Sequence, residues 1–455
     1  MRNSTVRAVN RLTKHWAAKA PAGAGGTVFT AAGVWPLLAL LADGSAGRAR
    51  AELAQVLGIS AEDAAEAARE LLAALDGVRD LRSATGVWAK SGLPLEERWS
   101  ARLPDGSRGV LTGDADTDRK AVDAWASERT DGLIRHMPVS LRQDTRLILA
   151  SALALRLKWA EPFMERPVPA QEGPWAGRTL RGLSRSTGSL DRIRVAQGRT
   201  GPVTALEVPG TGDVDVHLLL GDPVSPPGDV LATGISVITG DVPSVDGTGL
   251  PESNAGPDHG PDHGPDHGPD QDTDQGPGPG PGPGPGPGPG LTVSTVDSRS
   301  PHPLLRIDTV AFSLLAEHDL LENASVFGLE TATDQGHGHF PGISSEPLAI
   351  GSARQSALAR FHAAGFEAAA VTAVAARPGC APPPASHRAR RVEVSFRRPF
   401  GFLAVHRTSR LVLAAGWVAD PLPYEGRGAA ARTARPAPAQ EAPTSGYGVR
   451  ARVPE

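Results

Sequence analysis

The side chains that most often carry chemistry are scarce and scattered in this chain of 455 residues. Its one cysteine, Cys380, cannot form an intrachain disulfide, and a thiol without an evident activating neighbour is more often incidental than reactive. Histidines occur in a PDHG repeat and in an HGH turn at 337–339, which lack the fixed geometry of a metal site (His259, His263, His267). The sequence contains no G-x-S-x-G, H-E-x-x-H or phosphate-binding loop. We therefore expect no enzyme of the usual classes, no cofactor and no metal.

One segment is more informative, GFEAAAVTAV at 365–374. Pro378 and Gly379 follow it closely and oppose a helix that would continue. If the segment is extended, alternate residues point to one side, and all of them are small (Ala368, Ala370, Thr372, Val374, Ala376). The pattern predicts a segment that can become a buried strand without the usual bulk of one.

The surrounding elements indicate an α+β architecture with long-range strand pairing. The pattern of Asp116 to Met137 predicts a helix that Asp131-Gly132 stops, and Arg146 to Trp159 is apolar on both faces, as in a central strand. Two hairpins are expected, one from Val203–Val208 with Val214–Leu220, and one from Phe400–His406 with Leu411–Val418.

Glycine and proline, 53 and 42 residues, are concentrated in two segments that cannot form a core. Residues 246–290 hold the PDHG repeat and a Gly-Pro alternation, which we interpret as a disordered insert, and residues 422–455 as a disordered tail. The expected folded domain therefore has two parts, 1–245 and 291–421. The net charge of −4, with both signs mixed along the chain, gives no footprint for nucleic acid or an anionic membrane surface.

An apolar run from Val28 to Ala42 follows basic residues in the order of a secretory signal. Pro36 interrupts the run, and Arg7 to Trp16 has the pattern of an amphipathic helix. We expect a cytoplasmic protein, with secretion as the alternative. No run is long and apolar enough to span a membrane.

Four motifs, in order, resemble the serpin family of serine protease inhibitors. They are VFTAAGVW at 28–35, KWAEPF at 158–163, FPGIS at 340–344 and RRPFGFLAVH at 397–406, with GFEAAAVTAV in the place of the family's hinge. The chain is identified as a member of this family, of bacterial type. The resemblance implies a large central mixed sheet, two smaller sheets, about nine helices, and a metastable fold with an exposed reactive loop, here 363–395.

The resemblance also implies a function. A target protease of the serine or cysteine class would cleave the loop, which would then insert into the central sheet and trap the acyl-enzyme. The hinge would comprise eight residues (Gly365, Phe366, Glu367, Ala368, Ala369, Ala370, Val371, Thr372). The family's spacing of about fourteen residues from the hinge glycine puts the scissile bond at Gly379-Cys380. We expect a monomer. The alternative is a non-inhibitory serpin that acts as a substrate, carrier or scaffold.

Several residues depart from the family's pattern. Phe366 stands where inhibitors have a hydroxyl, and overpacking there would cost about 1–3 kcal/mol and slow insertion; Ala363 replaces a common Glu. The sheet-opening region keeps a hydroxyl at Thr30 and a polar side chain at Ser151. Other positions differ from the family's residues (Gly33 for Ser, Asp123 for Asn, Gln355 for His). Trp159 is expected in the core nearby. Thr30, Asp123, Ser151 and Gln355 could form another hydrogen-bond network. Arg388, Arg390 and Arg391 leave a later cleavage possible.

Overall fold

The computed structural model describes residues 1–20, 23, 25–104, 106–139, 141, 145–253, 287–334, 338–366 and 387–425. In these ranges the chain forms three sheets, three short 3-10 helices (173–175, 190–192, 331–333) and eight α-helices, against about nine helices expected. The α-helices are α1 (Asn3–Ala17), α2 (Ala31–Gly44), α3 (Gly47–Leu57), α4 (Ala61–Asp76), α5 (Glu97–Ser100), α6 (Ala115–Arg129), α7 (Pro227–Thr239) and α8 (Ala324–Phe327).

The large sheet is mixed, in the order β3-β2-β4-β15-β16-β5, with β14 paired to the other side of β15. Its strands are β2 (Leu81–Lys90), β3 (Arg108–Leu111), β4 (Leu147–Leu155), β5 (Leu157–Lys158), β14 (Phe312–Asp319), β15 (Ser352–Phe361) and β16 (Gly365–Phe366). Every residue of β4 is buried, and the strand pairs antiparallel with β2 and parallel with β15. The expected central strand is confirmed.

The second seven-stranded sheet has the order β1-β19-β18-β10-β9-β8-β11, and the five-stranded sheet has the order β12-β17-β13-β7-β6. The first contains β1 (Thr27–Phe29), β8 (Ile193–Gly198), β9 (Gly201–Pro209), β10 (Val214–Leu220), β11 (Val245–Asp246), β18 (Phe400–His406) and β19 (Val412–Val418). The second contains β6 (Met164–Pro169), β7 (Thr179–Thr187), β12 (Leu291–Ser298), β13 (Leu304–Val310) and β17 (His387–Ser395). Both expected hairpins are present, as β9–β10 and β18–β19.

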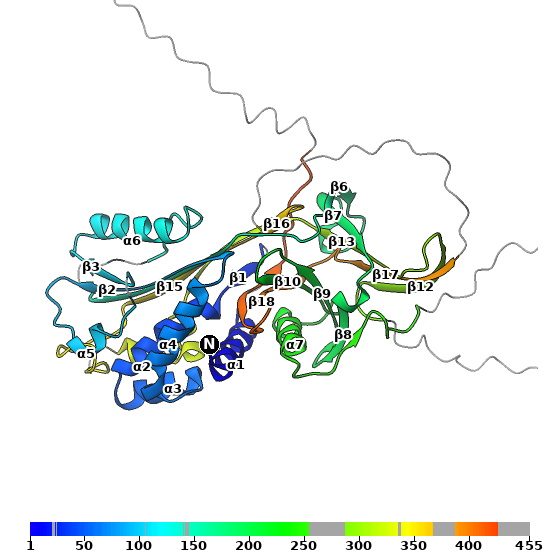
Figure 1. Cartoon of the computed structure of the whole chain (residues 1–455). Helices are drawn as coiled ribbons and strands as arrows, with labels where there is room; N and C mark the ends of the chain where they lie inside the picture. Colours follow the sequence, from blue (N-terminus) through cyan, green and yellow to red (C-terminus); the bar gives the residue numbers. More distant parts are fainter. Residues whose placement is uncertain are drawn as a thin grey trace, which may run out of the picture.

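Helices cover both faces of the large sheet. In Figure 1, α6 lies on one side of it, and α2, α3 and α4 lie on the other. The apolar run weighed above as a secretory signal forms β1 and α2, which are almost entirely buried, and Pro36 lies inside α2. Across the described ranges, no helix combines the length and apolar character needed to cross a membrane.

Several expected boundaries differ in the structure. The helix that begins near Asp116 ends at Arg129, and the predicted stop is confirmed, because Asp131 and Gly132 adopt left-handed conformations (φ 52° and 76°); other boundaries differ. Both ends of the expected insert, 246–253 and 287–290, belong to the fold, since the N–H of Ser253 bonds to Val293 O at 2.8 Å and the Thr204 hydroxyl to Pro289 O at 2.8 Å. Residues 254–286 lie outside the described ranges. Residues 422–425, expected in the tail, are also described, and 426–455 are not.

The C-terminal part of the expected loop is a strand. β17 pairs antiparallel with β12 and parallel with β13, inside the five-stranded sheet. Arg388, Arg390 and Arg391 therefore belong to a paired strand, and Arg390 donates hydrogen bonds to the carbonyl groups of Gly247 and Leu250. The suggested later cleavage at this basic cluster is wrong, because a strand paired on both sides cannot extend into a protease cleft.

Candidate functional site: the hinge and the seam of the large sheet

The first two hinge residues already form a strand of the large sheet. β16 lies between β15 and β5, where Phe366 is paired with Phe361 on one side and with Leu157 on the other. The N–H of His362 donates to Gly365 O at 2.9 Å and closes a tight turn between β15 and β16. Below this point β4 and β15 pair directly, Ile148–Ala154 with Ser352–Leu358, and we call this boundary the seam. The sheet is thus parted at one end and closed along the seam.

Gly365 is required where it stands because no side chain fits there. A Cβ on Gly365 would lie 2.2 Å from the carbonyl oxygen of Leu157 and 3.1 Å from Cα of Lys158. These are backbone atoms of the neighbouring strand and cannot move aside as a flexible side chain could. The glycine lets β16 approach β5 closely enough to pair.

Phe366 is completely buried, on the inner face of the sheet. The centroid of its ring lies 6.0 Å from that of Phe402 in β18, so the ring belongs to the core between the two larger sheets. The sequence argument treated Phe366 as bulk that must enter the sheet after cleavage. The ring instead occupies its site in the uncleaved chain, and the site is shaped to hold it.

Trp159 fixes the turn that precedes the hinge. Its indole Nε1 donates to His362 O at 2.8 Å, its backbone N–H donates to Ala364 O at 3.1 Å, and its ring lies 4.7 Å from that of Phe361. Ala363, expected as a departure from Glu, is buried here, and its carbonyl accepts the N–H of Phe163 at 2.8 Å. The core position expected for Trp159 is therefore also a structural support of the hinge.

In the middle of the seam, a pair of polar residues faces the start of α2. Ser151 of β4 and Gln355 of β15 lie directly opposite each other. The Gln355 amide donates to Thr30 O at 2.8 Å and accepts the Thr30 N–H at 2.9 Å, while the Thr30 hydroxyl accepts the N–H of Gly33 at 3.2 Å as the N-cap of α2. Gln355 thus ties β15 to the helix beneath the sheet.

Ser151 is close to this network but not part of it. Its hydroxyl is buried and has no hydrogen-bond partner among the described residues, and a Cβ on Gly33 would lie 2.4 Å from its oxygen. Gly33, which departs from the family's serine, makes room for the Ser151 side chain. Of the four polar residues expected to form a network, the structure therefore links only Thr30 and Gln355.

Asp123 lies on the opposite face of the sheet. It belongs to α6, and its carboxylate accepts the N–H of Met137 at 2.8 Å and lies 3.2 Å from Nδ1 of His136. These bonds fold the segment after α6 back over the outer face of β2 and β4, where Ile134, Met137 and Ile148 share a core cluster. Asp123 therefore takes no part in the network considered for Thr30, Asp123, Ser151 and Gln355, because the sheet separates it from Thr30.

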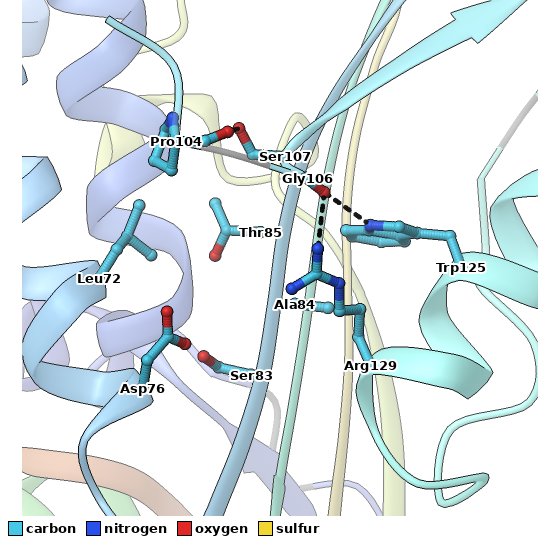
Figure 2. Close-up of a pocket in the computed structure, with 10 residues that line it drawn as sticks. All are labelled: Leu72, Asp76, Ser83, Ala84, Thr85, Pro104, Gly106, Ser107, Trp125 and Arg129. Atoms are coloured by element: carbon cyan, nitrogen blue, oxygen red, sulfur yellow. Dashed lines mark hydrogen bonds between the residues drawn. The ribbon is translucent and has the colours of Figure 1, made fainter.

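A second attachment of α6 could not be anticipated from the sequence. Figure 2 shows Trp125 and Arg129 of α6 directed at the turn before β3, where both donate to the carbonyl of Gly106, at 3.4 and 3.3 Å. The Trp125 ring lies edge-on to Trp88 of β2 at 6.1 Å, and Gly86 leaves space for it, since a Cβ there would lie 2.7 Å from the ring. These contacts hold α6 against the edge of the sheet.

The remaining expected site residues lie outside the described ranges. They are the rest of the hinge, from Glu367 to Thr372, and the scissile pair Gly379 and Cys380. The PDHG histidines and His337 are outside as well, whereas His339 is described and lies 3.4 Å from Asp334.

The comparisons with known proteins agree with this geometry. Residues 6–172 and 310–421 match the model of the family described as Serpin (serine protease inhibitor). Serpin-Z2A of Oryza sativa subsp. japonica is 31% identical over 152 residues, which cover 30% of this chain and 35% of that protein. A protein named serine protease inhibitor from Cyanea capillata is 31% identical over 141 residues, covering 28% and 37%. The chain thus spans about a third of the length of the curated relatives it matches.

Solved structures with the same fold cover almost the whole chain. A thyroxine-binding globulin complex with thyroxine gives a TM-score of 0.63 at 12% identity, covering 92% of this chain and 99% of that one. Serpin48 of the insect Tenebrio molitor gives 0.63 at 18%, covering 91% and 98%, and uncleaved ovalbumin gives 0.61 at 15%, covering 92% and 99%. At these identities the likeness concerns the fold alone. The family match spans more than half of the sequence, and the chain belongs to the serpin family.

Proposed function

We propose that this serpin is a protease inhibitor that acts as a suicide substrate. A serine or cysteine protease cleaves within residues 367–386, and the freed segment adds to the large sheet as a new strand between β4 and β15. Insertion of a serpin loop is a known example of strand addition and of the release of stored strain. The mechanism requires that the large sheet of this chain can accept the strand.

The observation that carries the proposal is the position of β16. Because β16 is antiparallel to both neighbours, each further loop residue pairs one residue further back on β4 and on β15. Six residues beyond Phe366, Thr372 comes opposite Ser151 and Gln355, which are six residues back from Leu157 and Phe361. Ser151, Gln355 and Phe366 all face the inner layer, so Thr372 would face it too.

This register matches side-chain size and polarity. Ala368 and Ala370 would enter beside inner-face residues that are already closely packed, and the hydroxyl of Thr372 would come to the Ser151 hydroxyl, which now lacks a partner. A buried hydroxyl without a hydrogen bond costs about 1–3 kcal/mol. Satisfying it would favour the inserted state over the uncleaved one.

The chemistry of the trap uses the protease's own nucleophile. At the proposed bond, the hydroxyl or thiolate of the protease attacks the carbonyl carbon of Gly379 and forms an ester or thioester, and the amine of Cys380 leaves with a proton. Insertion then moves the acyl-enzyme away from the hinge end before water hydrolyses it. The protein supplies the bait and the sheet, and the protease supplies the catalysis.

The test is to incubate the protein with subtilisin, elastase, trypsin and a papain-like protease. A denaturing gel should show a covalent band of the summed mass, and sequencing the released peptide should give the cleaved bond. Cleavage without a covalent band but with a large rise in melting temperature would show insertion that is too slow to trap. Cleavage with neither would contradict the proposal and leave the substrate, carrier or scaffold reading, which the changes at Gly33 and Gln355 favour.

Two further expectations are part of this proposal. The inhibitor acts as a monomer, because one copy supplies both the loop and the sheet. It meets its protease in the cytoplasm, a compartment that fractionation of the producing cells would test.

A further inference from the structure

A cavity of about 300 Å³ lies where the end of α2 meets the first turns of α3 and α4. α5 and the turn at 340–344 close it, and the turn is joined to α2 by a hydrogen bond from the N–H of Gly342 to Gly44 O at 3.0 Å. Its lining is mostly charged (Asp43, Arg50, Glu62, Arg98, Trp99, Arg102, Gly342). We call this cavity the basic pocket, because three guanidinium groups and two carboxylates line it.

Two of the three guanidinium groups are held in place from behind. Arg102 pairs through Nη1 with the largely buried carboxylate of Asp43. Arg50 donates through Nη1 to Ala42 O at 3.2 Å and to Ser45 O at 3.3 Å, carbonyl groups at the C-terminal end of α2, and its Nη2 pairs with Glu62 Oε1 at 2.5 Å. A guanidinium has five N–H donors, so each keeps donors that these bonds do not use.

The third guanidinium, that of Arg98, is different. It is exposed and forms no hydrogen bond or ion pair within the part of the chain that the structure describes. Next to it in α5, Trp99 is anchored by an indole bond to Leu40 O at 2.9 Å, which fixes the short helix that carries Arg98. Glu62, the ion-pair partner of Arg50, has a side chain that is 72% exposed, so a competing anion can displace it into solvent.

We propose that the basic pocket binds a phosphate group. Three guanidinium groups and two carboxylates give the lining one net positive charge, and guanidinium groups around a small hollow match the several oxygen acceptors of a phosphate. The volume is that of a site for a small molecule, not for a chain of charges. α4 is acidic in its first turn, which also disfavours a polyanion extending along that helix.

The experiment is a titration of the full chain with inorganic phosphate, in which calorimetry measures the heat of binding and a thermal melt measures the change in melting temperature. Sodium chloride at equal ionic strength serves as the salt control, and glucose 6-phosphate tests whether the group is accepted on a larger molecule. We expect saturable binding of phosphate. Binding of both probes assigns the pocket to phosphomonoesters, and binding of inorganic phosphate alone assigns it to the free ion. An equal effect of chloride would overturn the proposal.

Arg98→Gln is the decisive variant, because Arg98 supports no other part of the fold and its loss should leave the protein folded. Removing one charge-assisted contact should weaken phosphate binding about tenfold. Arg119→Gln, on the exposed surface of α6, is the matched control and should bind like the parent protein. Equal affinities in the two variants, or no binding by the parent protein, would refute the site. Neither result depends on protease trapping, so the proposed function stands or fails separately.

Discussion

At the hinge end of the large sheet the inner face consists of phenylalanine and leucine side chains, whereas in the middle of the seam it consists of small and polar side chains. Phe361 and Phe366 are completely buried and Leu157 lies beside them, supported by the bonds of Trp159 to the hinge turn. In the middle, Gln355 bonds to the backbone of Thr30, and the hydroxyl of Ser151 has no partner in the part of the chain that the structure describes.

The difference shows where each state of the sheet is stabilised. Burial of a phenylalanine side chain contributes about 1.5–3 kcal/mol, so the hinge end holds its two-residue strand firmly before any cleavage. The unpaired hydroxyl in the middle instead penalises the closed seam. In the proposed mechanism, the hinge end would therefore fix where insertion begins, and the middle would favour its continuation.

The largest effect is expected from a charge placed in the middle of the seam by the loop. In Thr372→Arg, insertion would bring a guanidinium opposite Ser151 and Gln355 on the buried face. We expect the loop to be cleaved as before and the covalent complex to be lost, which a denaturing gel measures against the parent protein. Trapping that continues in this variant would contradict the register derived from β16.

Phe366→Thr tests the hinge end directly. Replacing the ring leaves a cavity against Phe402 and should lower the free energy of unfolding of the uncleaved protein by about 3 kcal/mol, as urea denaturation would show. If the ring had to enter the sheet after cleavage and slowed insertion, this variant would trap more protease than the parent protein. Since the ring is already seated, we now expect no gain in yield, and a clear gain would restore the earlier argument.

Gly365→Ala should have a slightly smaller effect. The added Cβ would approach the carbonyl oxygen of Leu157 to 2.2 Å, so β16 must shift, at a cost of about 2 kcal/mol. Gly351→Ala is the matched control, because nothing lies within 4 Å of a Cβ at that exposed position. Equal melting temperatures for the two variants would mean that β16 is not held against β5.

The sequence was informative where the pattern is local. An apolar pattern on both faces identified β4, and turn residues between alternating segments identified both hairpins. It also placed the end of the helix that begins near Asp116 at Asp131-Gly132, two residues beyond its last residue, Arg129. It also took β17 for loop, because the strand contains three arginines and its buried residues, Ala389, Val392 and Val394, do not follow a regular alternation.

The site itself was less accessible from the sequence. The inward direction of Phe366 follows from alternation, but no local pattern shows that the residue is buried before cleavage. The bond between Thr30 and Gln355 joins residues 325 positions apart, and only the family resemblance brought them together. The same resemblance placed Asp123 with them, although the sheet lies between. The contacts of α6 with the turn before β3 could not be predicted either. The sequence shows only that Trp125 and Arg129 lie on a helix and that Gly106 lies in a turn.

The middle of the seam can be tested by removing its crowded contact. Gly33→Ala should destabilise the protein by about 1–2 kcal/mol, because the new Cβ would lie 2.4 Å from the Ser151 oxygen. Ser151→Ala removes that oxygen and an unsatisfied hydroxyl, so it should be neutral or stabilising. In the double variant most of the loss should disappear, and a double-mutant cycle in urea measures this coupling. Additive effects of the two substitutions would mean that Gly33 and Ser151 are not in contact.

The smallest effect concerns His318, which lies opposite Gln355 in the β14–β15 pair. Burial lowers the pKa of its imidazole below the ordinary 6.5, although the bond between Nε2 and Val28 O at 2.8 Å acts in the opposite direction. As the pH falls below 6.5, the unfolded chain takes up a proton at this residue before the folded one does, so stability declines toward acid and is unaffected above neutrality. His318→Gln keeps a donor for Val28 and does not titrate. Its melting temperature should therefore fall less than that of the parent protein between pH 7 and pH 5. Equal declines in the two proteins would mean that His318 does not cause the acid sensitivity.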